Sequence, residues 1–218
     1  MPAARSGNST VRALEGHYQH AKTLKAAFFQ RYSDGHGGVL AESGTVYFSR
    51  PGRMRWEYES PQQKLFLVDG TNVWFYVPAD RTASRAKLKE SSDWRTPLAL
   101  LAGKADLSAL CRKVEEVTAD AATGQAPGED ELTPGHTVLR CIPRDVEDTT
   151  SAPTQVLLEI DSEARLVRAV IREAGNAETE FRFGGWEENV PIPEVKFHFQ
   201  PPPDVAIVDE QSLGGDLR

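Results

Sequence analysis

The spacing of hydrophobic positions changes near residue 38 of the chain. From residue 9 to residue 30 they recur every three or four positions, as on one side of an amphipathic helix. From residue 39 onward they alternate with polar positions, as in strands that bury one face. The spacing therefore predicts a long helix over residues 9–30, followed by strands. The apolar stripe of this helix comprises Val11, Leu14, Tyr18, Ala21, Leu24 and Phe28.

Four short apolar runs follow the glycine-rich turn at residues 33–38. They read "GTVYFSR", "GRMRWEYE", "KLFLVDG" and "NVWFYVP", and turn-forming residues separate them, which predicts an antiparallel meander. In the second run, Met54, Trp56 and Tyr58 share one face. The opposite face carries Arg53, Arg55 and Glu57, and we expect it to contact water. The third and fourth runs are apolar on both faces, so either face of residues 73–77 fits a binding surface.

The rest of the chain continues this pattern after a short helical segment. Residues 95–110, "RTPLALLAGKADLSAL", predict one or two helices, with Thr96 as N-cap, Pro97 at the first helical position and Gly103 as a stop. Further strands are predicted in "RKVEEV", "HTVLRCI", "TQVLLEID", "RLVRAVIRE", "ETEFRFGGWEE" and "KFHFQ", and an extended segment in "QPPPDVAIVDE". Ten or eleven strands are more than an open twisted sheet usually carries without curling.

These patterns predict a mainly β fold with helices (α+β). We expect the sheet to curl into a barrel or part of one, with helices over its apolar concave side and an interior that is either a solid core or a cavity. Residues 1–8 are expected to be a disordered N-terminal segment and residues 9–218 a single domain, because no repeat or low-complexity linker divides them.

Composition narrows the functional classes. The chain has 218 residues, 39% of them hydrophobic, and a net charge of −7. This charge argues against nucleic acid or anionic lipid as a partner bound by bulk electrostatics. No stretch approaches the roughly 20 apolar residues that span a bilayer. The first residues lack a signal peptide, so the chain is either cytoplasmic or a mature form whose leader has been removed.

The two cysteines, Cys111 and Cys141, do not have the spacing of a metal site. If their segments pair as an antiparallel hairpin around the polar loop of residues 118–135, the two lie nearly opposite each other and a disulfide can form. Such a bond would indicate an oxidising compartment. The alternative is a pair of small buried thiols.

Few residues suggest catalysis. His17 and His20 lie three apart in the predicted helix without a neighbouring carboxylate or cysteine, and exposed helical positions explain them as well as a metal site. His36 lies in a glycine-rich turn that neither follows a strand nor opens a helix. Adjacent glutamates such as 115–116 and 187–188 point to opposite faces of a strand. We expect no catalytic residue, no metal and no cofactor.

Several segments, taken in order, resemble the LolA family of periplasmic lipoprotein carriers. They are "LKAAFFQRYSDG", "YFSRPGRMRWEY", "LFLVDGTNVWFYVP", "TPLALLAG" and "KFHFQPPPDVAIVDE". The resemblance implies an incomplete, strongly curved antiparallel β-barrel lidded by α-helices around a hydrophobic cavity. It implies a non-enzymatic periplasmic chaperone, acting as a monomer, that binds the acyl chains of triacylated lipoproteins. It also implies an inner-membrane ABC-type exporter and an outer-membrane acceptor as partners. The alternative from another class is a lipid- or lipoprotein-sensing module of the same fold.

The resemblance also implies site residues. Arg50 matches an arginine that bonds to the helical lid and closes the empty cavity, although a surface arginine at a strand end would look the same. The acyl-chain cavity would be lined by Phe28, Met54, Trp56, Tyr58, Leu98 and Leu101. The two cysteines and the acidic segment 119–135 between them depart from the family pattern, and we interpret the cysteines as a lineage-specific staple.

Overall fold

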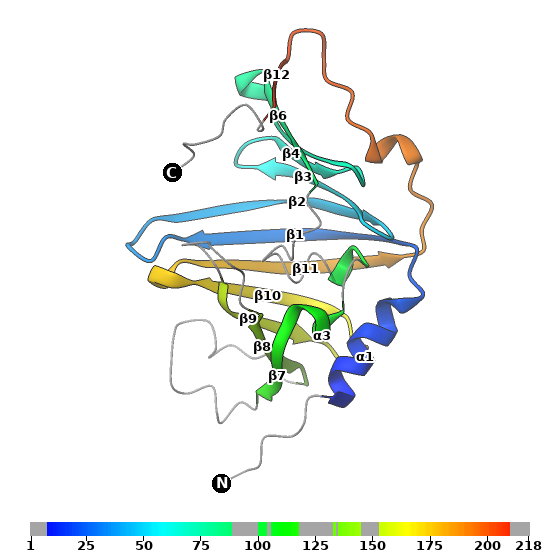
Figure 1. Ribbon diagram of the computed structural model, residues 1–218, viewed down its shortest axis with the longest axis vertical. Helices are drawn as coiled ribbons and strands as arrows, with labels where there is room; N and C mark the ends of the chain where they lie inside the picture. The colour runs from blue at the N-terminus through cyan, green and yellow to red at the C-terminus, as the bar shows by residue number, and fades with distance from the viewer. Residues whose placement is uncertain are drawn as a thin grey trace. The chain divides into compact units, whose positions relative to one another are not determined.

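The structure is a computed structural model that describes residues 8–88, 100–103, 106–117, 133, 135–144 and 153–209 (Figure 1). These residues form mainly β-strands with a few short helices. The N-terminal half contains α1 (Asn8–Gln19), β1 (Thr23–Ser33), β2 (Val39–Ser49), β3 (Arg53–Ser60), β4 (Lys64–Val68), β5 (Asn72–Val77), η1 (Pro78–Asp80) and β6 (Thr82–Lys87). The C-terminal half contains α3 (Leu107–Leu110), β7 (Cys111–Val117), β8 (Thr137–Pro143), β9 (Pro153–Ile160), β10 (Leu166–Glu173), η3 (Ala174–Asn176), β11 (Glu178–Glu188), η4 (Glu194–Phe197) and β12 (Ala206–Asp209).

The described strands follow the order β12-β6-β5-β4-β3-β2-β1-β11-β10-β9-β8-β7 in one twelve-stranded sheet. Strands β2 to β6 form an antiparallel meander, which confirms the prediction for residues 39–77. Strand β12 instead runs parallel to β6. By contacts, the chain divides into two compact units. The first unit contains residues 1–20, 30–40 and 92–183, and the second contains residues 21–29, 41–91 and 184–218.

The predicted helix over residues 9–30 is too long. Helix α1 ends at Gln19, and Thr23–Ser33 is strand β1. Leu24 and Phe28 are buried in this strand, with Ala26 buried between them, so their spacing of four is two periods of an alternating strand. The β-branched and aromatic residues of this segment favour the strand. Phe28 therefore lies on β1 and does not end a helix.

In the first unit, α1 and α3 lie on the same side of β8–β10 (Figure 1). Leu14 and Tyr18 of α1 are fully buried. The Tyr18 hydroxyl accepts a hydrogen bond of 3.0 Å from the backbone N–H of Leu166 at the start of β10. This bond satisfies a buried donor and fixes the helix to the sheet.

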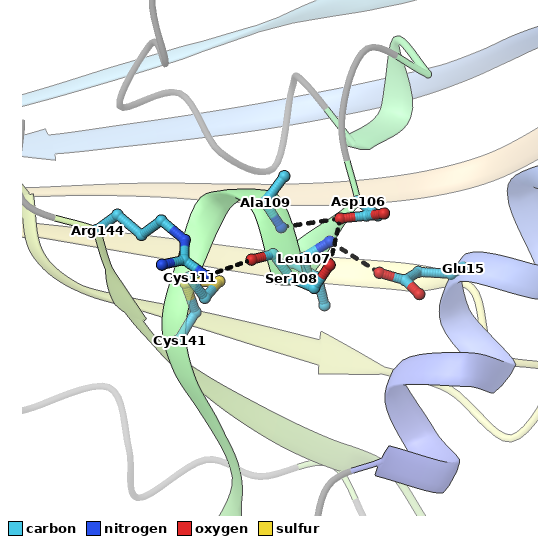
Figure 2. Close-up of a disulfide and its surroundings, with 8 residues drawn as sticks. All are labelled: Glu15, Asp106, Leu107, Ser108, Ala109, Cys111, Cys141 and Arg144. Atoms are coloured by element: carbon cyan, nitrogen blue, oxygen red, sulfur yellow. Dashed lines mark hydrogen bonds between the residues drawn. A yellow bond between two sulfur atoms is a disulfide. The ribbon is translucent and has the colours of Figure 1, made fainter.

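The predicted disulfide is present in the first unit. Cys111 at the start of β7 and Cys141 on β8 are joined, with their Cα atoms 5.6 Å apart (Figure 2). Both cysteines are buried. The link attaches the C-terminal end of α3 directly to the neighbouring hairpin strand.

The N-terminal end of α3 is held by two carboxylates (Figure 2). Asp106 is the N-cap and accepts 2.8 Å from the N–H of Ala109, while Glu15 of α1 accepts 2.7 Å from the N–H of Leu107. The Ser108 hydroxyl and the Ala109 N–H hold the pKa of Asp106 below its ordinary value. A four-residue helix is thus fixed at both ends by side chains.

In the second unit, η4 replaces a predicted strand at residues 196–200. Pro193 precedes this 3-10 turn and prolines follow at 201–203, so several backbone N–H groups that a ladder needs are missing. The face of β3 that carries Arg53, Arg55 and Glu57 was expected to contact water. It is instead partly covered by the η4 segment. The side chains of Arg55 and Glu57 are only 19% and 28% exposed. Lys196 contacts them, because its Nζ donates 2.8 Å to Glu57 and its carbonyl accepts 3.0 Å from Arg55.

Several predicted features lie outside the described residues. They are residues 1–7, Thr96, Pro97, Leu98 and nearly all of the acidic segment 119–135. Asn8, assigned to the N-terminal segment, begins α1. Within the described part of the chain, no helix is long and apolar enough to cross a membrane.

Candidate functional site

One face of the second unit is apolar across four strands. Val46, Trp56, Phe66 and Phe75 lie directly opposite one another on β2, β3, β4 and β5. A neighbouring row contains Phe48, Met54, Val68 and Val73. We call this surface, together with Phe28 and Tyr58, the Trp56 face.

The rings of the Trp56 face pack edge to face. The Phe28 ring lies 4.7 Å from that of Trp56 and 5.0 Å from that of Tyr58, and Phe48 lies 6.3 Å from Trp56. T-shaped contacts at these distances stabilise the cluster beyond its buried area. Exposure rises along the row, from 1% at Trp56 to 41% at Phe75. The face therefore runs from a buried aromatic cluster to an exposed ring.

The register decides the orientation of Trp74, which the sequence left open. Trp74 lies opposite Leu67 and so points away from the Trp56 face. It belongs to a buried cluster with Leu65, Leu67 and Phe197, against which Phe199 packs. This cluster is structural core on the opposite side of the strands.

Asp69 orients Trp74 from the β4–β5 turn. Its carboxylate accepts a hydrogen bond of 3.0 Å from the indole N–H of Trp74. It also accepts hydrogen bonds of 2.8 and 2.7 Å from the backbone N–H groups of Thr71 and Asn72. Burial disfavours the charged carboxylate, but these hydrogen bonds outweigh it and hold the pKa of Asp69 below its ordinary value.

Four of the six predicted cavity residues, Phe28, Met54, Trp56 and Tyr58, share the Trp56 face. Leu101 lies in the first unit, fully buried in a helical turn, and Leu98 lies outside the described residues. Sequence reasoning missed Phe48, Phe66 and Phe75. The short turn at residues 50–52 carried the signal for Phe48, because it places this ring opposite Met54.

Arg50 lies at the turn between β2 and β3, half-buried. Its Nη1 donates 3.4 Å to the carbonyl of Ala21, and its own N–H donates 2.9 Å to the carbonyl of Lys22. Both acceptors belong to the segment that follows α1. Neither acceptor belongs to a helix, so the bond from Arg50 to a helical lid stays a prediction.

A charged pair marks the other end of the Trp56 face. Lys64 lies opposite Tyr58 across the β3–β4 hairpin, and its Nζ lies 5.7 Å from the centre of the Tyr58 ring. Lys64 also forms an ion pair with Glu42 of β2. Their side chains are 19% and 7% exposed, so the pair is largely removed from water.

A groove of about 660 Å³ opens beside this pair. Its walls combine aromatic and proline side chains with charged ones. The lining residues are Arg55, Glu57, Tyr58, Glu59, Gln63, Lys64, Leu65, Tyr76, Pro78, Pro193, Val195, Lys196, His198, Phe199, Gln200 and Pro202. Arg55, Glu57, Leu65 and Tyr76 of this lining lie on the opposite side of the strands from the Trp56 face. Tyr58 and Lys64 line the groove and also belong, by their register, to the Trp56 face.

Metal binding finds no support among the residues that the structure describes. They contain no cluster of three or more histidine, cysteine, aspartate or glutamate side chains that could hold an ion. The His17 ring instead lies 4.9 Å from that of Tyr18.

Comparison with known proteins shows which proteins this chain resembles. Residues 19–125 match the family described as outer membrane lipoprotein carrier protein LolA. The outer-membrane lipoprotein carrier protein of Nitrosospira multiformis is 28% identical over 201 residues, which cover 92% of this chain and 88% of that protein. The chain is thus similar, over most of its length, to proteins named as outer-membrane lipoprotein carriers.

Another relative has the same printed name. The outer-membrane lipoprotein carrier protein of Nitrosomonas europaea is 28% identical, over 92% of this chain and 89% of that protein. Among solved structures, an uncharacterized conserved protein from Thermus thermophilus superposes with a TM-score of 0.54 at 11% identity, over 93% of this chain and 98% of that one. It shares the fold.

Proposed function

We propose that this chain is a periplasmic carrier that binds the acyl chains of lipoproteins released from the inner membrane and carries them to the outer membrane. The names of its sequence relatives support this proposal. The structural observation that supports it is the Trp56 face, whose aromatic rings pack together on neighbouring strands of the second unit.

Binding an acyl chain requires a large apolar surface, because the chain is poorly soluble in water. Each methylene group removed from water contributes about 0.8 kcal/mol, so a chain of about sixteen carbons gains roughly 13 kcal/mol on burial. A carrier must supply an apolar surface of this scale and must also release its cargo. Rings that pack edge to face, and that become more exposed toward Phe75, can separate to admit a chain.

The proposed acyl-chain surface in the second unit comprises Phe28, Met54, Trp56 and Tyr58. Leu98 and Leu101 stay sequence predictions for the same role, as do helices that act as a lid. In the empty state, Arg50 holds the segment after α1 through the Ala21 carbonyl. Acyl chains that enter displace this segment and break the bond. The empty, closed state therefore competes with ligand, which aids release.

The proposed partners are triacylated lipoproteins, an inner-membrane ABC-type exporter that loads the carrier, and an outer-membrane acceptor. The carrier acts as a monomer. Its disulfide fits an oxidising compartment such as the periplasm.

Lipoprotein release from membranes tests the proposal. Inner-membrane vesicles that contain the exporter and a triacylated lipoprotein are incubated with the purified protein, with and without ATP. We expect the lipoprotein to appear in the soluble fraction, bound to the protein, only when ATP is present. Lipoprotein that stays in the membrane pellet at every protein concentration would refute the carrier function.

A further inference from the structure

The ion pair between Lys64 and Glu42 lies at one end of the Trp56 face. A surface that binds only acyl chains has no need of charged groups. Glu42 is only 6% exposed. Taking two charges out of water costs free energy, and an apolar pair of similar volume is often as stable or more so. The pair also adjoins the aromatic cluster, since Lys64 lies over the Tyr58 ring and this ring contacts that of Phe28. A role in recognition would explain its position.

The chemistry of the pair indicates which ligands it would accept. A lysine ammonium has three N–H donors, and Glu42 accepts from one of them. The remaining donors can bind carbonyl oxygens where an acyl chain joins its ester or amide linkage. Because Glu42 cancels the charge of Lys64, the pair offers hydrogen bonds without offering net positive charge.

The same arrangement disfavours anions. A phosphate or carboxylate bound by Lys64 would lie close to the buried Glu42 carboxylate, where few water molecules screen the repulsion. The adjacent groove is lined by Glu57 and Glu59 but also by Arg55, Lys64 and Lys196, so the repulsion is expected at the Lys64–Glu42 pair and not throughout the groove. The groove itself provides room for an uncharged polar group that leaves the Trp56 face at Lys64 and Tyr58.

We infer that the Lys64–Glu42 pair selects acyl chains that end in neutral ester or amide linkages and rejects lipids that carry an anionic group at this point. The inference rests on the proposed function, because it takes the acyl chains to lie on the Trp56 face. It would let the carrier take up an acylated protein and leave behind membrane lipids with a phosphate next to their acyl esters.

Competition binding tests the inference. A fluorescent apolar dye bound to the protein is displaced by a tripalmitoylated cysteinyl peptide amide, by palmitate or by palmitoyl lysophosphatidate. Wild type should bind the uncharged peptide more tightly than either anion, in part because the peptide has three acyl chains, so the decisive readout is the change that Glu42→Gln makes in the affinity for each anion. Glu42→Gln should improve binding of both anions by about tenfold or more, because it leaves the Lys64 charge uncompensated.

Two further variants keep the test decisive. Glu187→Gln removes one negative charge from the exposed Lys25–Glu187 pair of the same unit and should change nothing. Glu42→Gln with Lys64→Gln should return the affinity for palmitate to near the wild-type value, because the free ammonium is gone, and its fold is checked by circular dichroism.

The outcomes separate the two hypotheses. Equal affinity of wild type and Glu42→Gln for the anions, with peptide binding intact, overturns the selection and leaves the carrier function standing. Enhanced palmitate binding that persists in the double variant also overturns it, because Lys64 would not be the group that recognises the anion. Absence of peptide binding by wild type would overturn both hypotheses.

Discussion

The two compact units bury different kinds of side chain. The first unit buries mainly aliphatic residues: Leu139, Leu158 and Ala169 lie opposite one another on β8, β9 and β10, all fully buried. The second unit buries aromatic rings on both sides of its strands, around Trp56 on one face and Trp74 on the other.

The restraints also differ. The first unit contains the disulfide between Cys111 and Cys141. The second unit has no disulfide among its described residues, and its Trp56 face ends in an exposed ring. Aliphatic packing with covalent restraint suits a fixed core, whereas aromatic rings of graded exposure suit a surface that opens. We therefore expect the first unit to stabilise the fold and, under the proposed function, the second unit to bind the acyl chains.

Truncation of the buried tryptophan should have the largest effect. Trp56→Ala is expected to lower the free energy of unfolding by about 3–5 kcal/mol, because it leaves a cavity among Phe28 and Phe48. Phe75→Ala on the same row should cost much less, since its ring is 41% exposed. Urea unfolding followed by circular dichroism measures both. Equal losses of unfolding free energy in the two variants would contradict the expectation that the rings contribute less to stability as they become more exposed.

Loss of the disulfide should be nearly as costly. The bond joins residues 30 apart in sequence, and the chain-entropy model gives about 3–4 kcal/mol for a loop of this size. We expect Cys111→Ser with Cys141→Ser to lower the free energy of unfolding by this amount, and a reducing agent to destabilise wild type alone. An unchanged unfolding midpoint in the double variant would show that the first unit does not depend on its covalent restraint.

The strands were more predictable than the helices. Alternation over residues 39–77 predicted the meander because each run has turn residues on both sides. It failed at residues 23–33, where Leu24 and Phe28 fit a helical and a strand period equally, and hydrogen bonding to neighbouring strands decided between them. The C-terminal "KFHFQ" alternates like a strand, but the prolines around it prevent a ladder.

The site was predictable in part. Strand β3 alternates cleanly, so its apolar face was identified from the sequence. Strands β4 and β5 are apolar on both faces, and only their register separates Phe75 from Trp74. The Lys64–Glu42 pair joins residues of non-adjacent strands 22 positions apart, a contact that no local pattern encodes.

Asp69 provides a test of the structural face of the second unit. Asp69→Asn should lower the free energy of unfolding by about 2 kcal/mol at neutral pH, because a charged acceptor of several hydrogen bonds is lost. The pKa of Asp69 is lower in the folded state than its ordinary 3.8, so its contribution is present above that pH and is lost as the pH falls below it. The difference between variant and wild type should therefore shrink below about pH 4. A pH-independent difference would contradict the role of its charge.

Substitution of Arg50 should change the free energy of unfolding least, but it should clearly change the binding of an apolar dye and of lipoprotein. Arg50→Leu removes the bond to the Ala21 carbonyl, which at 3.4 Å contributes about 1.5 kcal/mol or less. We expect the empty variant to bind an apolar dye more strongly and to release preloaded lipoprotein more slowly. Arg50→Lys, which lacks the guanidinium fork, should resemble the leucine variant. Dye binding and release rates equal to those of wild type would make Arg50 an ordinary surface arginine.

Photo-crosslinking from opposite faces of the second unit tests the central claim most directly. Phe75 and Ile207 are similarly exposed, at 41% and 45%, but Ile207 pairs with Ala83, which lies opposite Tyr76 and so faces away from Phe75. A benzophenone side chain is placed at either position, and the protein is loaded with a triacylated lipoprotein and irradiated. The Trp56 face predicts capture of the acyl chains at position 75 and none at position 207. Equal capture at both positions, or capture at 207 alone, would contradict the assignment of acyl binding to this face.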